Sequence, residues 1–185
     1  MVVAALRRRM TDLRRWEIDG FVVIADVVGD HASDGLRAHL DSFAQTGAGS
    51  RNLLREPWCR GLACDLRERP GPVALLPRDA VAVQCTLFDK SPAKNWLVAL
   101  HQDLSIPVKR RVDSSECSGW SEKEGGLYVQ PPVEVLEQLV AVRVHIDECP
   151  AKSGALRVVP GSHVYGRLDG RASKKLREER REVVP

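Results

Sequence analysis

Long hydrophobic runs are absent from this sequence of 185 residues. No apolar stretch approaches the roughly 18 residues that span a bilayer. The arginines near the N-terminus are not followed by the apolar segment of a secretion signal. We therefore expect neither a membrane partner nor export, and we predict a cytoplasmic protein.

Cysteine pairing motifs and a strong charge imbalance are also missing. The five cysteines are odd in number and include no C-x-x-C pair with a matching pair downstream, which argues against a zinc module or a disulfide framework. The formal charge is only +3, and the clusters at Arg7–Arg9 and around Lys174–Lys175 are not interleaved with aromatic residues. These clusters are typical of solvated faces, so we expect no nucleic-acid partner.

What the sequence does contain is the composition of a folded protein, with 43% hydrophobic and 29% charged residues. A chain of this length is expected to form a single hydrophobic core. We predict a single domain over residues 1–185: N-terminal helices and a first strand in 1–50, a β-rich part in 78–165, and a charged, helix-favouring tail in 170–185.

The N-terminal third shows helical periodicity. Apolar residues at helical spacing predict a surface helix over about 5–17 that ends near Gly20, followed by a strand at Phe21–Ile24. A second amphipathic helix is predicted from Leu36, Leu40 and Phe43, with Ser33 as its cap and Gly47 and Gly49 at its end. Residues 51–77 are expected to form a loop with short helical pieces.

Four stretches rich in Val and Leu predict strands: Ala80–Phe88, Trp96–His101, Leu139–Ile146 and Ala155–Val159. No helix is predicted between each pair, which favours an antiparallel arrangement over a doubly wound parallel sheet. We therefore predict a mainly β, α+β fold of the jelly-roll (double-stranded β-helix) type with flanking N-terminal helices.

His101 and Asp103 stand two residues apart at the end of a predicted strand, so their side chains should share one face. An imidazole and a carboxylate are two parts of the 2-His-1-carboxylate set that holds Fe(II). The H-x-D pattern alone is common by chance, and a polar strand end is the alternative.

The sequence around His101 and Asp103 favours the metal-binding interpretation over a polar strand end. Beside His101-Gln102-Asp103, the segments that carry a resemblance are Trp16–Ile24, Gln84–Lys90, Val142–Asp147 and Gly154–His163. Together they resemble the phytanoyl-CoA dioxygenase family, in particular its bacterial members. The resemblance spans nearly the whole chain and implies an Fe(II)- and 2-oxoglutarate-dependent dioxygenase that hydroxylates a small organic substrate.

The resemblance also implies roles for individual residues. His101 and Asp103 would bind the iron, while Gln102, Gln84 and Trp120 would contact 2-oxoglutarate. For Gln84 and Trp120 a structural role, as a strand amide and a core indole, is an equal alternative. The sequence has no signature for the identity of the substrate or the oligomeric state.

This sequence departs from the family in its last part. The second metal histidine and the arginine that pairs with 2-oxoglutarate are not evident, and we expect the chain to stop before the strands that carry them, leaving the jelly roll incomplete. His145 is expected in the core, and His163 is a minor candidate for the third ligand that we expect to lie out of reach. Such a chain should bind Fe(II) weakly and turn over little or no 2-oxoglutarate.

Two other hypotheses stay open. One is a non-catalytic remnant or binding module that keeps the same fold. The other is a cupin-like metal hydrolase or isomerase on the same architecture, because a fold alone does not choose among chemistries.

Overall fold

The N-terminal helix of the computed structural model ends as the sequence predicts. The structure describes residues 13–41, 49–89, 98–150 and 154–184, and within them residues 13–19 are helical. Gly20 closes this helix with a φ of +78° and donates its N–H to the Trp16 carbonyl at 3.0 Å. The helix is thus confirmed where it is described, and the rest of the predicted range, before residue 13, lies outside the described residues.

The next two predictions are corrected by the structure. The stretch Phe21–Ile24 is not a strand, because no described segment pairs with it. Helix α2 (Asp30–Asp41) begins before Ser33, whose N–H already donates to the Gly29 carbonyl at 3.0 Å. Ser33 is therefore inside the helix and is not its cap. The amphipathic character is confirmed by Leu36, which is buried, whereas Phe43 and Gly47 lie outside the described residues.

Residues 51–77 are more ordered than the sequence suggests. They form a short 3-10 helix, η1 (Leu53–Arg55), and α4 (Pro72–Leu75), which are the short pieces expected, but also the twelve-residue helix α3 (Pro57–Glu68). The prediction of a loop is wrong for α3. A proline at the first helical position starts it without loss of a hydrogen bond, and burial of Cys59 and Leu66 stabilises it.

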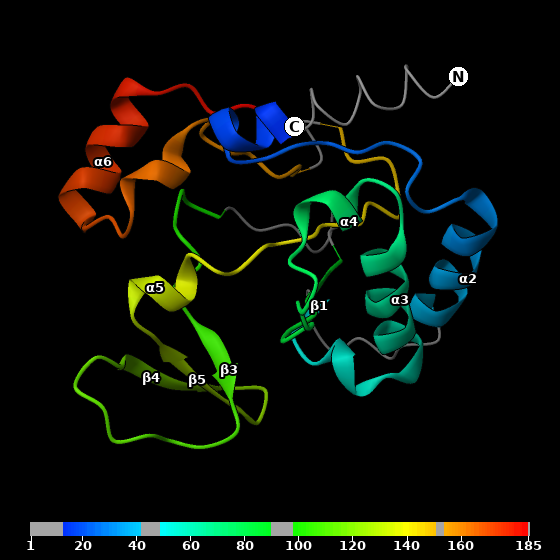
Figure 1. Cartoon of the computed structure of the whole chain (residues 1–185), viewed down its shortest axis with the longest axis horizontal. Helices are drawn as coiled ribbons and strands as arrows, with labels where there is room; N and C mark the ends of the chain where they lie inside the picture. The colour runs from blue at the N-terminus through cyan, green and yellow to red at the C-terminus, as the bar shows by residue number, and fades with distance from the viewer. Residues whose placement is uncertain (1–12, 42–48, 90–97, 151–153, 185) are drawn as a thin grey trace.

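Two small antiparallel sheets carry the strands (Figure 1). In the first, β1 (Gly49–Ser50) pairs with β2 (Leu87–Phe88). In the second, β5 (Gly126–Gln130) lies between β3 (Ile106–Val108) and β4 (Ser118–Lys123). Helix α5 (Val133–Leu136) follows this sheet, and α2, α3 and α4 lie on the other side of the molecule.

Most of the predicted strands are not strands in the described residues. Ala80–Phe88 contributes only β2 and an isolated bridge at Cys85, and Ala155–Val159 only a bridge between Val158 and Val183. Residues 98–101 and Leu139–Ile146 belong to no helix or strand, and residues 96–97 lie outside the described residues. The reason is pairing: an apolar segment becomes a strand only beside another strand.

The C-terminal part begins with a 3-10 helix, η3 (Ser162–Tyr165), and continues into α6 (Gly170–Glu179). Asp169 caps α6 by accepting from the Ala172 N–H at 2.7 Å. The prediction of a helix in the charged tail is confirmed. Helices and antiparallel sheets together agree with an α+β class, but helices hold more of the described residues than strands do, and the jelly roll itself stays a prediction.

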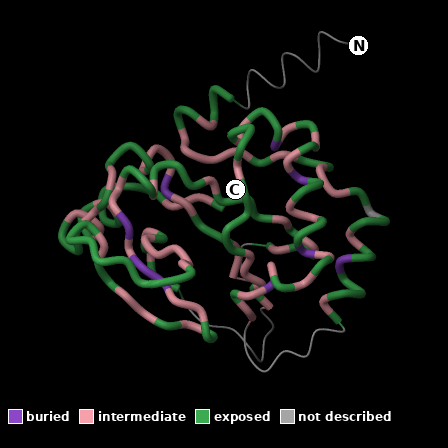
Figure 2. The backbone as a smooth tube through the Cα atoms, turned by 60° about the horizontal axis from the view of Figure 1, so that its bottom comes forward, coloured by how far each residue is buried: buried purple, intermediate pink, exposed green. Residues whose placement is uncertain are grey.

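The buried hydrophobic residues of the described chain are few and come from both sides of the molecule (Figure 2). Among the described residues they are Leu36, Leu53, Cys59, Leu66, Tyr128, Val129 and Val159. Burial raises the pKa of the Cys59 thiol to about 12, helped by its contact with the Cys85 thiol. At neutral pH Cys59 is therefore a protonated core residue rather than a nucleophile. No helix in the described ranges is both long and apolar enough to cross a membrane.

Glu124 joins the two halves of the molecule from the turn between β4 and β5. Its Oε2 accepts from the Arg51 backbone N–H at 2.8 Å and from Ser50 Oγ at 3.1 Å, and its Oε1 accepts from Arg51 Nη1 at 3.1 Å. Its backbone carbonyl accepts from Asn52 Nδ2 at 2.9 Å. These donors, the Arg51 N–H first, hold the pKa of the Glu124 carboxyl below its ordinary value of 4.5.

Replacing Glu124 with glutamine is expected to lower the free energy of unfolding at pH 7 by about 1 kcal/mol, since the charge-assisted hydrogen bonds are partly exposed to solvent. Because the folded state lowers this pKa, the stabilisation is present above about pH 4.5 and is lost as pH falls through the folded value. Urea unfolding at pH 7 and at pH 3 measures both effects. An equal difference between wild type and Glu124→Gln at the two pH values would contradict the assignment.

Candidate metal centre and neighbouring cavities

The predicted metal pair lies on the irregular segment that leads into β3. His101 Nε2 and Asp103 Oδ1 are 3.6 Å apart, although this segment is not the strand end that the sequence suggests. Their side chains are 57% and 97% exposed. The two groups thus face one another at the surface, on the same side of the chain.

A backbone carbonyl orients the His101 ring. Its Nδ1 lies 2.8 Å from the Ala99 carbonyl oxygen. Because a carbonyl only accepts, Nδ1 is the donor in this contact, and Nε2 is the ring nitrogen that faces Asp103. Metal-binding histidines commonly donate their second ring N–H in this way.

The donor set of this pair fits Fe(II). A neutral imidazole nitrogen and a carboxylate oxygen are ligands of the 2-His-1-carboxylate type, and atoms 3.6 Å apart can both reach one ion through bonds of about 2.0–2.2 Å. In residues 13–41, 49–89, 98–150 and 154–184 no group of three or more His, Cys, Asp or Glu side chains is arranged to hold a metal. Ligation by His101 and Asp103 therefore stays a prediction, and its third donor is not assigned.

The two later histidines have other surroundings. His163, in η3, directs its Nε2 to the Glu17 carbonyl at 3.2 Å and packs its ring against Gly20, where a Cβ would clash with it. This contact ties η3 to the N-terminal helix. His145 is exposed, so its prediction as a core residue is wrong: the stretch Leu139–Ile146 forms no strand and thus no buried face.

The Gln102 side chain is engaged at both ends. Its Oε1 accepts from the Leu168 N–H and its Nε2 donates to the Gly166 carbonyl, each at 2.8 Å. These bonds fasten the segment before α6 beside His101. A cavity of about 40 Å³ remains there, lined by Leu100, His101, Gln102, Val159, Ser162, Leu168, Ser173 and Leu176. The geometry gives Gln102 a positioning role, and contact with 2-oxoglutarate stays a prediction.

Gln84 and Trp120 lie elsewhere. Gln84 donates from Nε2 to Thr86 Oγ1 at 2.8 Å and lines a larger cavity of about 200 Å³. Trp120, in β4, is half-buried with the Arg111 guanidinium carbon 5.0 Å from its ring centroid. Neither residue lines the cavity beside His101. The structure thus does not bring the predicted cosubstrate residues together in one cavity.

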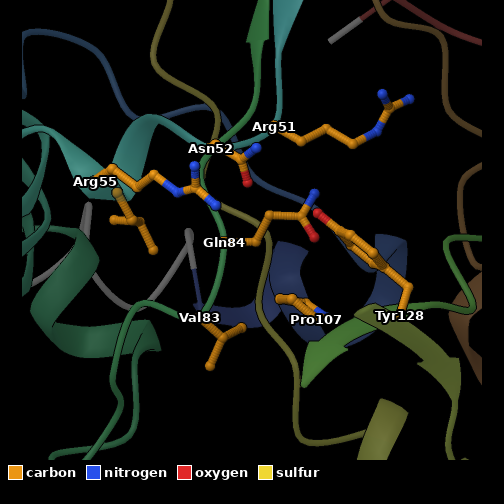
Figure 3. Close-up of a pocket in the computed structure, with 8 residues that line it drawn as sticks. Arg51, Asn52, Arg55, Val83, Gln84, Pro107 and Tyr128 are labelled. Atoms are coloured by element: carbon orange, nitrogen blue, oxygen red, sulfur yellow. The ribbon is translucent and has the colours of Figure 1, made fainter. Parts of the chain in front are cut away.

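The larger cavity was not anticipated from the sequence (Figure 3). Its lining comes from four separate segments: Arg51, Asn52, Leu54 and Arg55, then Val83 and Gln84, then Pro107, then Tyr128. Arg51 and Arg55 are distant from Gln84 in the sequence and form no motif with it, so no sequence signal pointed to this cavity.

Comparison with known proteins places the chain in a family. No curated protein and no solved structure matches it. A family model described as phytanoyl-CoA dioxygenase matches residues 16–185. This match covers nearly the whole chain, including the H-x-D segment and the late Pro160-Gly161-Ser162 turn. The chain therefore belongs to the phytanoyl-CoA dioxygenase family.

Proposed function

We propose that this protein is a non-haem Fe(II)- and 2-oxoglutarate-dependent dioxygenase that hydroxylates a small organic substrate. The observation that carries the proposal is the His101–Asp103 pair, whose Nε2 and Oδ1 face one another at 3.6 Å with Nδ1 engaged by a carbonyl. The family suggests the oxygenase chemistry. The pair supplies donors of the type that this chemistry needs.

The roles of the chain's own residues follow from their contacts. His101 and Asp103 would hold the iron, and bound Fe(II) with 2-oxoglutarate would supply the oxidising power for the hydroxylation. The Ala99 carbonyl fixes the His101 tautomer, so that Nε2 is free to bind metal. The side chain of Gln102 holds residues 166–168 beside the segment that carries His101 and Asp103, and these hydrogen bonds limit the movement of that segment.

Succinate release tests this proposal. The protein is incubated under air with Fe(II), ascorbate and 2-oxoglutarate, and succinate is measured by proton NMR. We expect slow release above the protein-free background, since two donors are evident in the described part of the chain, and a return to background in His101→Ala. The exposed His145→Ala is the matched control and should retain the wild-type rate.

One observation favours a second candidate, a non-catalytic binding module with the same fold. The Asp103 side chain is 97% exposed and the cavity beside His101 holds only about 40 Å³, so little encloses the pair from water. Succinate at background in the wild type, or release that His101→Ala leaves unchanged, would favour this candidate over the oxygenase.

A further inference from the structure

The larger cavity lies where the helical side of the molecule meets the three-stranded sheet (Figure 3). Its volume of about 200 Å³ is below the roughly 300–1,000 Å³ of sites for drug-sized ligands. It therefore suits a small molecule or one end of a larger one. It shares no lining residue with the cavity beside His101.

The charge of this cavity is positive. Arg51 is already paired with Glu124, at 3.1 Å between Nη1 and Oε1. The Arg55 guanidinium has no ion-pair partner or hydrogen-bond acceptor among the described residues, and in Figure 3 it extends toward the amides of Asn52 and Gln84. None of the lining residues is acidic. The exposed Arg55 guanidinium is therefore available to an anion at the cavity.

The hydroxyl of Tyr128 is a second polar group at this cavity. The residue is only 3% exposed, yet its hydroxyl has no hydrogen-bond partner in the part of the chain that the structure describes. Buried tyrosine hydroxyls usually have one. Among the described residues, the one side-chain polar atom that is both fully buried and without a partner is Arg69 Nε. The Tyr128 hydroxyl is therefore not fully buried. Because Tyr128 lines the cavity, we take its hydroxyl to open into it.

From these observations we infer that the cavity binds the carboxylate of a small organic acid, and that this acid is the substrate rather than 2-oxoglutarate. The Arg55 guanidinium offers the planar fork that pairs with a carboxylate, and the Tyr128 hydroxyl offers one more donor. The Lys123 ammonium, 5.0 Å from the ring centroid of Tyr128, adds a second positive charge near the cavity and also favours an anion. The identification of the acid as a substrate rests on the proposed oxygenase function; the anion site does not.

Benzoate and its neutral analogue benzamide are suitable probes, titrated by NMR into the metal-free protein. We expect benzoate to bind and benzamide not to bind. Arg55→Gln should weaken benzoate binding by roughly tenfold or more, as loss of a charged hydrogen-bonding partner predicts. Tyr128→Phe keeps the buried ring and should weaken binding by about threefold to tenfold.

The controls separate a local effect from a general change in charge or folding. Arg177→Gln removes one positive charge from the exposed surface of α6 and should leave benzoate binding unchanged. Arg55→Lys keeps the charge and should restore part of the affinity lost in Arg55→Gln. Equal binding of benzoate and benzamide, no benzoate binding at all, or full affinity in Arg55→Gln would overturn the inference.

A competition experiment identifies the source of the carboxylate. If 2-oxoglutarate displaces benzoate from the wild type, and Arg55→Gln weakens 2-oxoglutarate to the same degree, the cavity is a cosubstrate site and our assignment to the substrate is wrong. If 2-oxoglutarate does not compete, the assignment stands. If the protein binds benzoate but releases no succinate that depends on His101, the anion site is supported and the oxygenase proposal is wrong.

Discussion

Alanine in place of His101 is expected to lower the affinity of the protein for Co(II), an air-stable substitute for Fe(II), by roughly 100-fold. Two protein donors are evident, so loss of one leaves a single exposed carboxylate, Asp103, which binds divalent ions little better than any surface acid. This loss lies at the upper end of the roughly 10- to 100-fold typical of changes to residues that only orient a ligand. Titration calorimetry measures the affinity.

The other histidines provide the controls for this experiment. His145→Ala should leave the affinity unchanged, because His145 is exposed and lies in no cluster of possible ligands in the described chain. His163→Ala should also leave it unchanged, since that ring contacts the Glu17 carbonyl and Gly20. A loss in His163→Ala as large as in His101→Ala would show that His163 is the third ligand.

Local signals in the sequence predict the local features of this fold. The helix that ends at Gly20 was recognisable because a glycine with positive φ can close a helix without a partner elsewhere in the chain. The approach of His101 to Asp103 was also predicted, from the rule that residues i and i+2 of a strand share one side. The two side chains meet although this segment is not a strand, so the predicted strand pairing was not required.

Features that depend on distant contacts were missed. Strand β4 (Ser118–Lys123) is largely polar, with serine, glycine and two charged residues, and it is a strand because β5 pairs with it. The apolar stretch Leu139–Ile146 has the composition of a strand but lacks a partner in the described residues. Composition describes one segment at a time, whereas a ladder of hydrogen bonds needs two.

The same reason explains the outcome for the candidate sites. The cavity with Arg55 and Tyr128 brings together segments more than 70 positions apart, and no spacing rule encodes that contact. The Gln102 amide was expected near 2-oxoglutarate, but its hydrogen bonds to Gly166 and Leu168 connect residues 64 and 66 positions away. A motif identifies residue types that suit a chemistry, and packing decides which of them meet.

Leu53→Ala is expected to have the largest effect on stability, a loss of about 2–5 kcal/mol in the free energy of unfolding. Leu53 is 2% exposed in η1, and its backbone N–H donates to the Cys85 carbonyl at 3.3 Å. Truncation removes buried apolar surface and leaves a cavity beside this contact.

The size of the buried core determines how severe that loss is. Few hydrophobic side chains are buried in the described part of the chain, and domains are typically stable by only about 5–15 kcal/mol, so Leu53→Ala removes a large share of the total.

Val81→Ala is the matched control: Val81 is 71% exposed, and the change should alter stability by less than about 0.5 kcal/mol. Urea unfolding followed by circular dichroism compares the two variants. If they were equally stable, Leu53 would not be packed in the core, and the packing of η1 against α3 would have to be wrong. Because Arg51 and Arg55 flank Leu53 in the chain, that result would also remove the basis for the anion site.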